Sequence, residues 1–486
     1  MITMKKLSIL IAALLVFAIG SFGQSIKALN SFKSMKLKVT QDYLGEVSGD
    51  HYFVSTLSKT LVVADENFRP VKTAKLPIKK KARVYSDWVK LVDDKIYISY
   101  GFAGKNYIKV VTKLGALVKD VTLKEGTSSN ITDDNAFSII NNETGEVSVY
   151  KITDGVKEVY TSAAYFKNFN KAVKKEIEVT LHTNQNNTFN VVITDKKQVK
   201  IYVENYKTDE IDEEIIDLKE NTNIYRDIDL LFDDKDRLVV GIFKRVENPD
   251  KKRHEDEYQG LKLYVYKTTE AGITEENIFE ETFPDNMIEE WKEEYKAKRY
   301  EGIISHLMIE QVHFSEDEVY VLMNVTDLES TTTTTTGANN STTTTTTWTR
   351  TNNAMFITQF SAEDEPNTIM IKRKTALTAG GSSIIEQRAK SCALIEREGD
   401  VYVLYNYYGT KDDYDKKERD RVIIKKLGQN LELHDYADLI VFDMVKNKYP
   451  LYIDFNILKQ EGNKYWFYGI FNLIRSDGAV VELTFD

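Results

Sequence analysis

Short apolar runs separated by polar turns recur along most of the chain. In residues 88–123 this pattern predicts four strands, at 88–92, 96–100, 107–112 and 117–123. Asp93 and Asp94 form the first turn, because Asp side chains hydrogen-bond their own backbone and tolerate unusual backbone angles. Tyr and Phe are abundant and Pro is scarce, which is typical of a strand-rich folded chain.

The same strand–turn–strand unit repeats about eight times, at an early spacing of about 40 to 46 residues. Four short antiparallel strands joined by turns form one blade of a β-propeller. We therefore predict an all-β fold, a β-propeller with seven or eight four-stranded blades, with a β-sandwich pair or another all-β array as the alternative. The unit at 136–162 has a weak first strand, and if it merges with a neighbour the count is seven. The last unit lacks a strand, which residues 31–41 could supply to close the ring.

Four segments show the repeat most clearly: DDKIYISY, DKDRLVVGIF, EDEVYVLMNV and EGDVYVLYNY. They resemble the units of secreted β-propeller proteins in general, and the resemblance covers most of the chain after residue 23. The chain has no WD dipeptide and no sialidase-type S-x-D-x-G-x-x-W box. The resemblance is therefore to an architecture, and it implies no site residues.

Residues 1–23 are predicted to be a signal peptide. Two lysines precede an apolar run at 7–19, which is short for a membrane span, and small residues lead to a cleavage site before Gln24. A retained membrane anchor is the alternative. No second apolar run of spanning length follows. We therefore expect an exported protein, periplasmic or extracellular, whose residues 24–486 form a single propeller domain.

One helix is predicted over 286–300, within an insertion at 285–302. Asp285 is a plausible N-cap, and Ile288 and Trp291 lie on one face of the helix. Trp291 is predicted either to pack against the rim of the blades or to belong to a helix face that binds a partner.

A second insertion, 330–348, contains two runs of six threonines on either side of Gly-Ala-Asn-Asn. Thr favours strands, and facing Thr pairs stabilise antiparallel neighbours. We predict a protruding Thr-rich β-hairpin that continues two blade strands, with a mobile low-complexity loop as the alternative. Candidate binding residues for a protein or glycan are Asn339 and Asn340 at its tip and Trp348 and Arg350 at its base.

Composition and motifs argue against several functions. The formal net charge of −10 argues against a nucleic-acid partner, because phosphate binding needs a basic field. The single cysteine, Cys392, excludes an intramolecular disulfide and is predicted to be buried. The histidines lack metal-ligand spacing, so we expect no metal and no cofactor, and the acidic residues near His254 and Asp233 are only weak cation candidates. No G-x-S-x-G elbow and no Walker loop occurs.

These features favour an exported, non-enzymatic propeller that binds a protein or glycan partner. Two alternatives stay open from the residues. One is a carbohydrate-active propeller enzyme that uses carboxylates in the channel. The other is a structural subunit of a cell-envelope or extracellular assembly.

Overall fold

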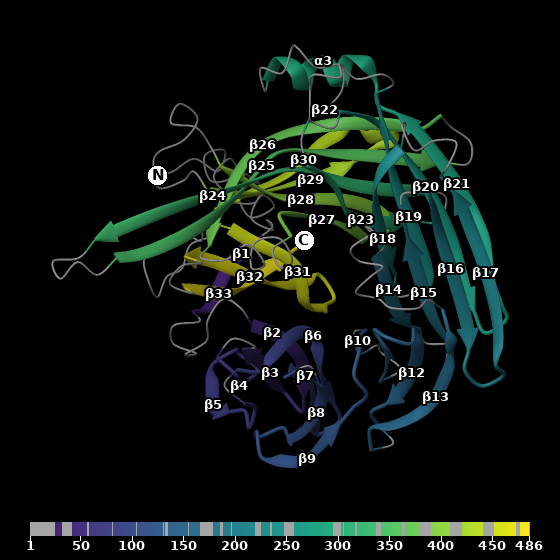
Figure 1. Cartoon of the computed structure of the whole chain (residues 1–486). Coiled ribbons are helices and arrows are strands. Elements are labelled where there is room, and N and C mark those ends of the chain that lie inside the picture. The colour runs from purple at the N-terminus through teal and green to yellow at the C-terminus, as the bar shows by residue number, and fades with distance from the viewer. Residues whose placement is uncertain are drawn as a thin grey trace, which may run out of the picture.

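A computed structural model of the chain describes residues 25–485 apart from 32–40, 56–57, 80, 104, 130, 132–134, 154, 166–177, 185–187, 196, 219–224, 234–235, 247–256, 295–302, 305, 316–317, 337–341, 362–364, 380–389, 409–419, 441–451 and 473–476. Its strands form eight antiparallel sheets, which follow one another around a ring (Figure 1). We number these sheets blade 1 to blade 8 in chain order.

The first four blades each contain four consecutive strands. Their bounds are β2 (Gln41–Val47), β3 (Asp50–Ser55), β4 (Thr60–Ala64) and β5 (Pro70–Lys75) in blade 1; β6 (Arg83–Val92), β7 (Lys95–Phe102), β8 (Lys105–Thr112) and β9 (Leu117–Thr122) in blade 2; β10 (Thr127–Ser128), β11 (Ala136–Ile140), β12 (Glu146–Lys151) and β13 (Lys157–Ala164) in blade 3; and β14 (Glu178–Thr183), β15 (Thr188–Thr194), β16 (Gln198–Asn205) and β17 (Glu210–Asp217) in blade 4.

Blades 5 to 7 also contain consecutive strands, with small additions, whereas the N-terminal strand β1 completes blade 8. Their bounds are β18 (Tyr225–Phe232), β19 (Arg237–Arg245), β20 (Glu257–Thr269) and β21 (Gly272–Thr282) in blade 5; β23 (His306–Phe314), β24 (Glu318–Thr336), β25 (Thr342–Ser361) and β26 (Asn367–Ala379) in blade 6; β27 (Cys392–Arg397), β28 (Asp400–Tyr408), β29 (Asp420–Leu427) and β30 (Leu433–Ile440) in blade 7; and β31 (Tyr452–Glu461), β32 (Lys464–Asn472), β33 (Asp477–Thr484) and β1 (Ser25–Ser31) in blade 8. The two-residue strand β22 (Ile303–Ile304) pairs with β20, and a 3₁₀ turn, η1 (Gln429–Leu431), precedes β30.

An apolar cluster fills each junction between neighbouring blades. Between blades 1 and 8, for example, Phe53 and Phe68 pack with Trp466 and Val480. The other seven junctions are filled in the same way by one cluster each. Because successive side chains of a strand point to opposite faces, each blade contributes to the clusters on both of its sides. The predicted β-propeller fold is confirmed, with eight blades.

The weakest predicted unit proves to be a complete blade. Its innermost strand, β10, has only two residues, Thr127 and Ser128, which pair with Ile140 and Ile139 of β11. So short a strand leaves little alternation of apolar and polar residues, which explains why the sequence left seven or eight blades open.

The ring closes through the N-terminal strand β1. It pairs with β33 from Ser25↔Thr484 to Ser31↔Ala479 and forms the outermost strand of blade 8. The prediction that an early strand completes the last blade is confirmed, but the predicted bounds, 31–41, were wrong: the closing strand lies earlier, residues 32–40 lie outside the described residues, and Gln41 begins β2. Local alternation indicates that a segment can form a strand, but the neighbouring sheet edge decides which segment pairs with it.

The predicted helix is present as α3 (Asp285–Glu294) at the rim of the ring (Figure 1). Met287, Ile288 and Trp291 are buried in the cluster between blades 5 and 6. On the exposed side, Lys372 of β26 forms ion pairs with Glu290 and Glu294 at 2.9 and 3.3 Å. The rest of the predicted helix, 295–302, lies outside the described residues.

Gly241 of β19 marks a close approach between blades 5 and 6. A Cβ atom at this position would lie 2.3 Å from Cδ1 of the buried Ile309. We expect Gly241→Ala to lower the free energy of unfolding by about 1–2 kcal/mol, because Ile309 must leave its packed rotamer. Chemical denaturation measures this change. Gly101→Ala is the matched control, since no atom lies within 4 Å of a Cβ there; equal effects of both substitutions would contradict the expectation.

Candidate functional site

The most unusual feature of the ring is a pair of strands that runs on beyond it. β24 and β25 have 19 and 20 residues and pair from Glu318↔Ser361 out to Thr336↔Thr342. β23 stops pairing with β24 at Thr326, and β26 stops pairing with β25 at Trp348. We call residues 330–336 of β24 and 342–348 of β25 the Thr ribbon. It projects from the body of the ring (Figure 1).

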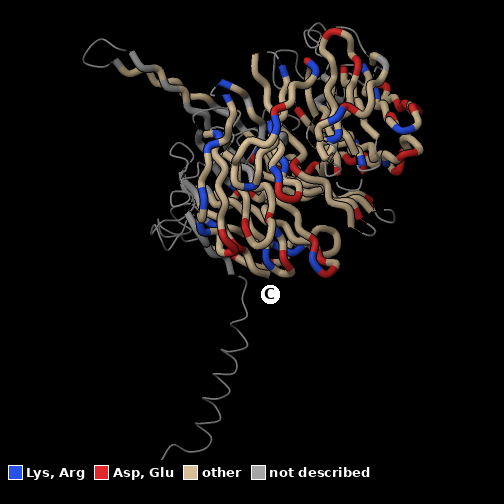
Figure 2. Tube along the Cα trace, turned by 90° about the horizontal axis from the view of Figure 1, so that it is seen from below, with Lys and Arg blue, Asp and Glu red and all other residues tan. Residues whose placement is uncertain are grey.

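Apart from Ser330 and Trp348 at its base, the Thr ribbon consists of threonines, and it carries no charged residue. Residues 331–335 are exposed. Oγ1 of Thr332 lies 3.1 Å from Oγ1 of Thr346, and Oγ1 of Thr334 lies 3.4 Å from that of Thr344. Figure 2 shows the ribbon without Lys, Arg, Asp or Glu, whereas charged residues are spread over the blades. A ladder of facing Thr pairs therefore holds the ribbon together.

The outer edge of the ribbon is accessible to another strand. Among the described residues, no strand lies alongside β24 beyond Thr326 on the side away from β25. Natural edge strands usually carry charges, prolines or bulges that prevent further strand pairing. The six-residue Thr run of β24 has none of these, so its edge is a site where an additional strand can pair.

Two of the predicted binding residues lie at the base of the ribbon. Trp348 pairs with Ser330 on one side and Ala379 on the other, and Arg350 lies two residues further along β25. At these positions β24, β25 and β26 lie side by side, with Arg350 between Leu328 and Leu377. Asn339 and Asn340 lie outside the described residues.

Trp291, the remaining candidate, is 3% exposed and packs inside the ring's apolar core. Its position agrees with the packing alternative given for this residue. A side chain so deeply buried has little surface to offer a partner.

A buried polar cluster lies where β24 and β26 leave the ring. Arg373 of β26 donates hydrogen bonds from Nη2 to Oδ1 of Asn324 and Oγ of Ser391, both at 2.6 Å, and from Nη1 to the carbonyl of Ser391 at 2.8 Å. Asn324 of β24 donates to Oε1 of Glu310 at 2.8 Å. Arg373 is only 3% exposed. We call these four residues and Asn406 the basal cluster.

The basal cluster continues into blades 7 and 8. Nδ2 of Asn406 donates to the carbonyls of Ser391 and Ile453, at 3.3 and 2.7 Å, and the Ile453 amide donates to Oδ1 of Asn406 at 2.8 Å. The next residue, Asp454, accepts hydrogen bonds from the amides of Lys390 and Asn456 at 3.0 and 3.1 Å. Burial raises the pKa of Asp454 to about 7. Three blades are thus linked beneath the ribbon.

Reasoning from sequence missed the basal cluster, although a signal for it exists. Asn324 and Asn406 follow the matching apolar runs EVYVLM and DVYVLY in the second strands of blades 6 and 7. An amide at the end of a buried strand needs hydrogen-bond partners. The same residue type at equivalent positions of two neighbouring blades indicates a link between them.

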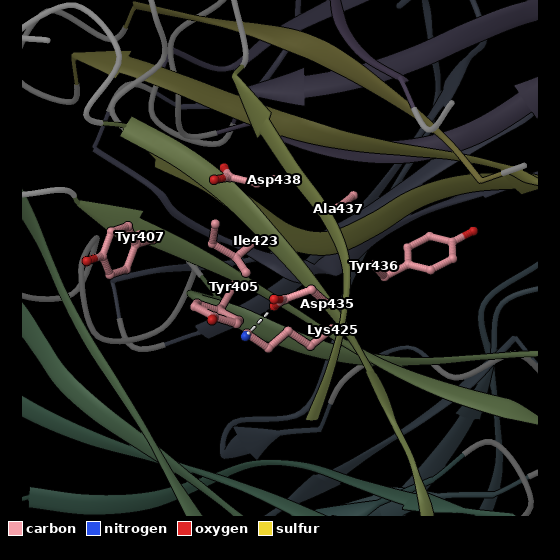
Figure 3. A pocket seen from close by; sticks show the side chains of 8 residues that line it. All are labelled: Tyr405, Tyr407, Ile423, Lys425, Asp435, Tyr436, Ala437 and Asp438. Carbon is pink, nitrogen blue, oxygen red and sulfur yellow. Dashed lines mark hydrogen bonds and ion pairs between the residues drawn. The ribbon is translucent and has the colours of Figure 1, made fainter. Parts of the chain in front are cut away.

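A pocket of about 430 Å³ lies on blade 7 (Figure 3). It is lined by Tyr405, Tyr407, Ile423, Lys425, Asp435, Tyr436, Ala437 and Asp438. Lys425 Nζ lies 2.6 Å from Asp435 Oδ1, and Arg421 Nη1 lies 2.7 Å from Asp438 Oδ2. Burial raises the pKa of the Tyr405 hydroxyl, so it stays protonated. With both carboxylates paired to cations, the pocket presents aromatic surface and hydrogen-bonding groups rather than net charge.

Other titratable groups are held by structural contacts. Glu204 accepts hydrogen bonds from the hydroxyls of Tyr160 and Tyr165, and burial raises its pKa. Asp233 accepts hydrogen bonds from the amide and Nε of Arg237, at 2.8 and 2.6 Å. Cys392 is buried, as predicted.

Neither a metal cluster nor a membrane-spanning helix is found in the part of the chain that the structure describes. No three His, Cys, Asp or Glu residues there gather in an arrangement that could hold a metal ion. None of the helices there is long and apolar enough to cross a membrane. His254 and the predicted signal peptide lie outside this part of the chain.

No protein-family model and no curated protein matches the chain. Among solved structures, the Dos1 propeller is similar over 94% of this chain and 95% of that one, with 10% identity and a TM-score of 0.46. The WD40 domain of SCAP from fission yeast covers 95% of this chain and 98% of that one, at 10% identity and a TM-score of 0.37. The Nup133 β-propeller domain of Vanderwaltozyma polyspora covers 92% and 99%, at 9% identity and a TM-score of 0.38. At these identities the likeness concerns the fold alone, which the strand pairing within this chain already defines.

Proposed function

We propose that the protein is an exported, non-enzymatic β-propeller that binds a partner protein through the Thr ribbon. The β-propeller is a common scaffold for protein interaction. The observation that carries the proposal is the uncharged edge of β24, which projects beyond the ring with no described strand alongside it after Thr326. A partner strand that pairs with such an edge gains backbone hydrogen bonds for affinity, and side chains nearby supply specificity.

The ribbon is suited to a protein more than to a glycan, because the edge of β24 presents a row of backbone N–H and C=O groups that can pair with a strand of another protein. Trp348 and Arg350 lie in β25 at the base of the ribbon and are the residues we propose for specificity. Aromatic residues and arginine commonly dominate the energetics of protein interfaces. In the basal cluster, Arg373 of β26 is hydrogen-bonded to Asn324 of β24 and to Ser391, so the two strands are tied together before the ribbon begins.

Export is proposed from the signal-peptide pattern of residues 1–23. The expected mature N-terminus is Gln24, which mass spectrometry of the extracytoplasmic fraction would detect. Recovery of the protein with residues 1–23 still attached would contradict cleavage.

A pull-down tests the ribbon's role. Mature protein and a variant in which 331–347 are replaced by Asn-Gly, a tight hairpin turn, are used to capture proteins from the parent cell envelope and medium. We expect at least one partner that the intact protein captures and the shortened one does not. A third sample carries Thr332→Val and Thr334→Val, which keep the strand shape and remove two hydroxyls. Capture should survive these changes if backbone pairing is what binds. A partner set that is the same for intact and shortened protein would contradict the proposal.

A further inference from the structure

We propose that the partner of the Thr ribbon is a second copy of this chain, with the outer edge of β24 paired to the same edge of the other copy in antiparallel orientation. This rests on the proposed function, of which it names the partner. The result is a two-fold symmetric dimer in which an identical edge serves on both sides.

The first step is that Thr runs in this chain already pair with each other. Within the ribbon, β24 and β25 match six threonines to six threonines, from Thr331↔Thr347 to Thr336↔Thr342. Two of these pairs bring their hydroxyl oxygens to 3.1 and 3.4 Å. A second copy would offer β24 the same partner chemistry on its other side. Pairing between two copies therefore requires no complementary charges, because each Thr run presents the same side chains to the other.

The second step concerns which edge is used. The edge of β24 extends past its neighbour β23 from Asp327 to Thr336, whereas β26 accompanies β25 as far as Trp348 and leaves only residues 342–347 beyond it. The β24 edge is therefore the longer one. The six-residue Thr run alone spans roughly 20 Å of strand.

The third step concerns orientation. Asp327 and Glu329 lie at the base of the ribbon in β24. Parallel pairing in register would set each of these carboxylates against its own copy, and like charges directly opposite are destabilising. Antiparallel pairing centred on Thr333 separates the acidic residues of the two copies. It also places the two rings at opposite ends of the paired ribbons, since each ribbon projects from its own ring (Figure 1).

The fourth step concerns register. In the antiparallel arrangement the two-fold axis is perpendicular to the sheet and preserves its faces, so Thr333 of one copy lies opposite Thr333 of the other, on the same face. Identical residues leave register weakly specified. The acidic base residues limit sliding in one direction and the end of the run limits it in the other. The interface is small, so we expect a dimer that depends on concentration rather than a permanent one.

Sedimentation velocity of the full mature chain tests the proposal, over roughly 1 to 100 µM, a range suited to weak association. We expect the weight-average mass to rise toward twice that of the monomer. The double substitution T333K/T334K sets Lys against Lys across the two-fold axis, and so does T333E/T334E with Glu. Each variant alone should be monomeric, while an equimolar mixture should recover the dimer through Lys–Glu pairs.

The matched control is T343K/T344K in β25, which should dimerise like the unmodified protein. Circular dichroism melting establishes that every variant is folded. The proposal is overturned if the mature chain stays monomeric at all concentrations, if T333K/T334K dimerises unchanged, or if T343K/T344K alone abolishes the dimer. A monomer that still captures another protein through the ribbon in the pull-down would refute self-pairing and leave the proposed function standing.

Discussion

Replacing Arg373 with methionine is expected to lower the free energy of unfolding by about 1.5 to 3 kcal/mol. Methionine fills the volume of the aliphatic stem but cannot donate hydrogen bonds. The substitution leaves the buried Oδ1 of Asn324 without its charged donor, while Oγ of Ser391 keeps the hydrogen bond from Nδ2 of Asn324. A buried acceptor that loses its partner keeps the whole cost of its desolvation. Urea denaturation followed by tryptophan fluorescence measures the change.

The neighbouring residue supplies the control. Lys372 lies next to Arg373 in β26, is about half exposed, and pairs with Glu290 and Glu294 of α3 at the surface. Lys372→Met should cost less than about 1 kcal/mol, because exposed ion pairs contribute little. If both substitutions had the same effect, the basal cluster would not be a significant source of stability.

Asp454→Asn is expected to stabilise the protein, and increasingly so as the pH rises. Burial raises the pKa of Asp454 from 3.8 to about 7, so the folded state holds a proton that the unfolded state releases above about pH 4. The contribution of Asp454 to the free energy of unfolding therefore falls from about pH 4 to pH 7 and then levels off. Asparagine keeps an Oδ1 acceptor for the amides of Lys390 and Asn456 and cannot ionise.

The expected gain for Asp454→Asn is at most roughly 4 kcal/mol at pH 8 and near zero at pH 4. Chemical denaturation at pH 4, 6 and 8 gives the three values. Asp435→Asn removes a carboxylate that is exposed and paired with Lys425, and it should show no gain at pH 8. A stability difference for Asp454→Asn that stays constant across this pH range would show that the carboxyl is not protonated in the folded state.

Much of the ring could be predicted because the strands of one blade are consecutive in the sequence. Strands such as β7 (Lys95–Phe102) and β8 (Lys105–Thr112) are adjacent in sequence and pair through a short turn, so their pattern is visible in the residues themselves. The strands β10 and β1 were harder to predict from the sequence. β10 has two residues, and β1 pairs with a strand at the other end of the chain.

The candidate site was predictable only in part for the same reason. Trp348, Arg350 and the Thr runs stand out as composition, and the structure places all of them in β24 and β25. The basal cluster joins Asn324, Arg373 and Asn406 across two blades, and its hydrogen bonds follow from how the blades pack. Each residue taken alone is an ordinary polar residue in a strand.

The pairing of β1 with β33 has a consequence for how the chain reaches its folded form. Ser25 meets Thr484 across nearly the whole sequence, so the contact that completes blade 8 has the greatest sequence separation in the fold. The entropy of closing so long a loop must be overcome before that contact contributes any stability, and topologies rich in such contacts fold slowly. Until then the edge of β33 remains an unpaired template. Closure is therefore the step at which newly made chains are most exposed to mispairing, and a tag or mutation that weakens β1 should lower the yield of folded protein more than it lowers the stability of the finished ring.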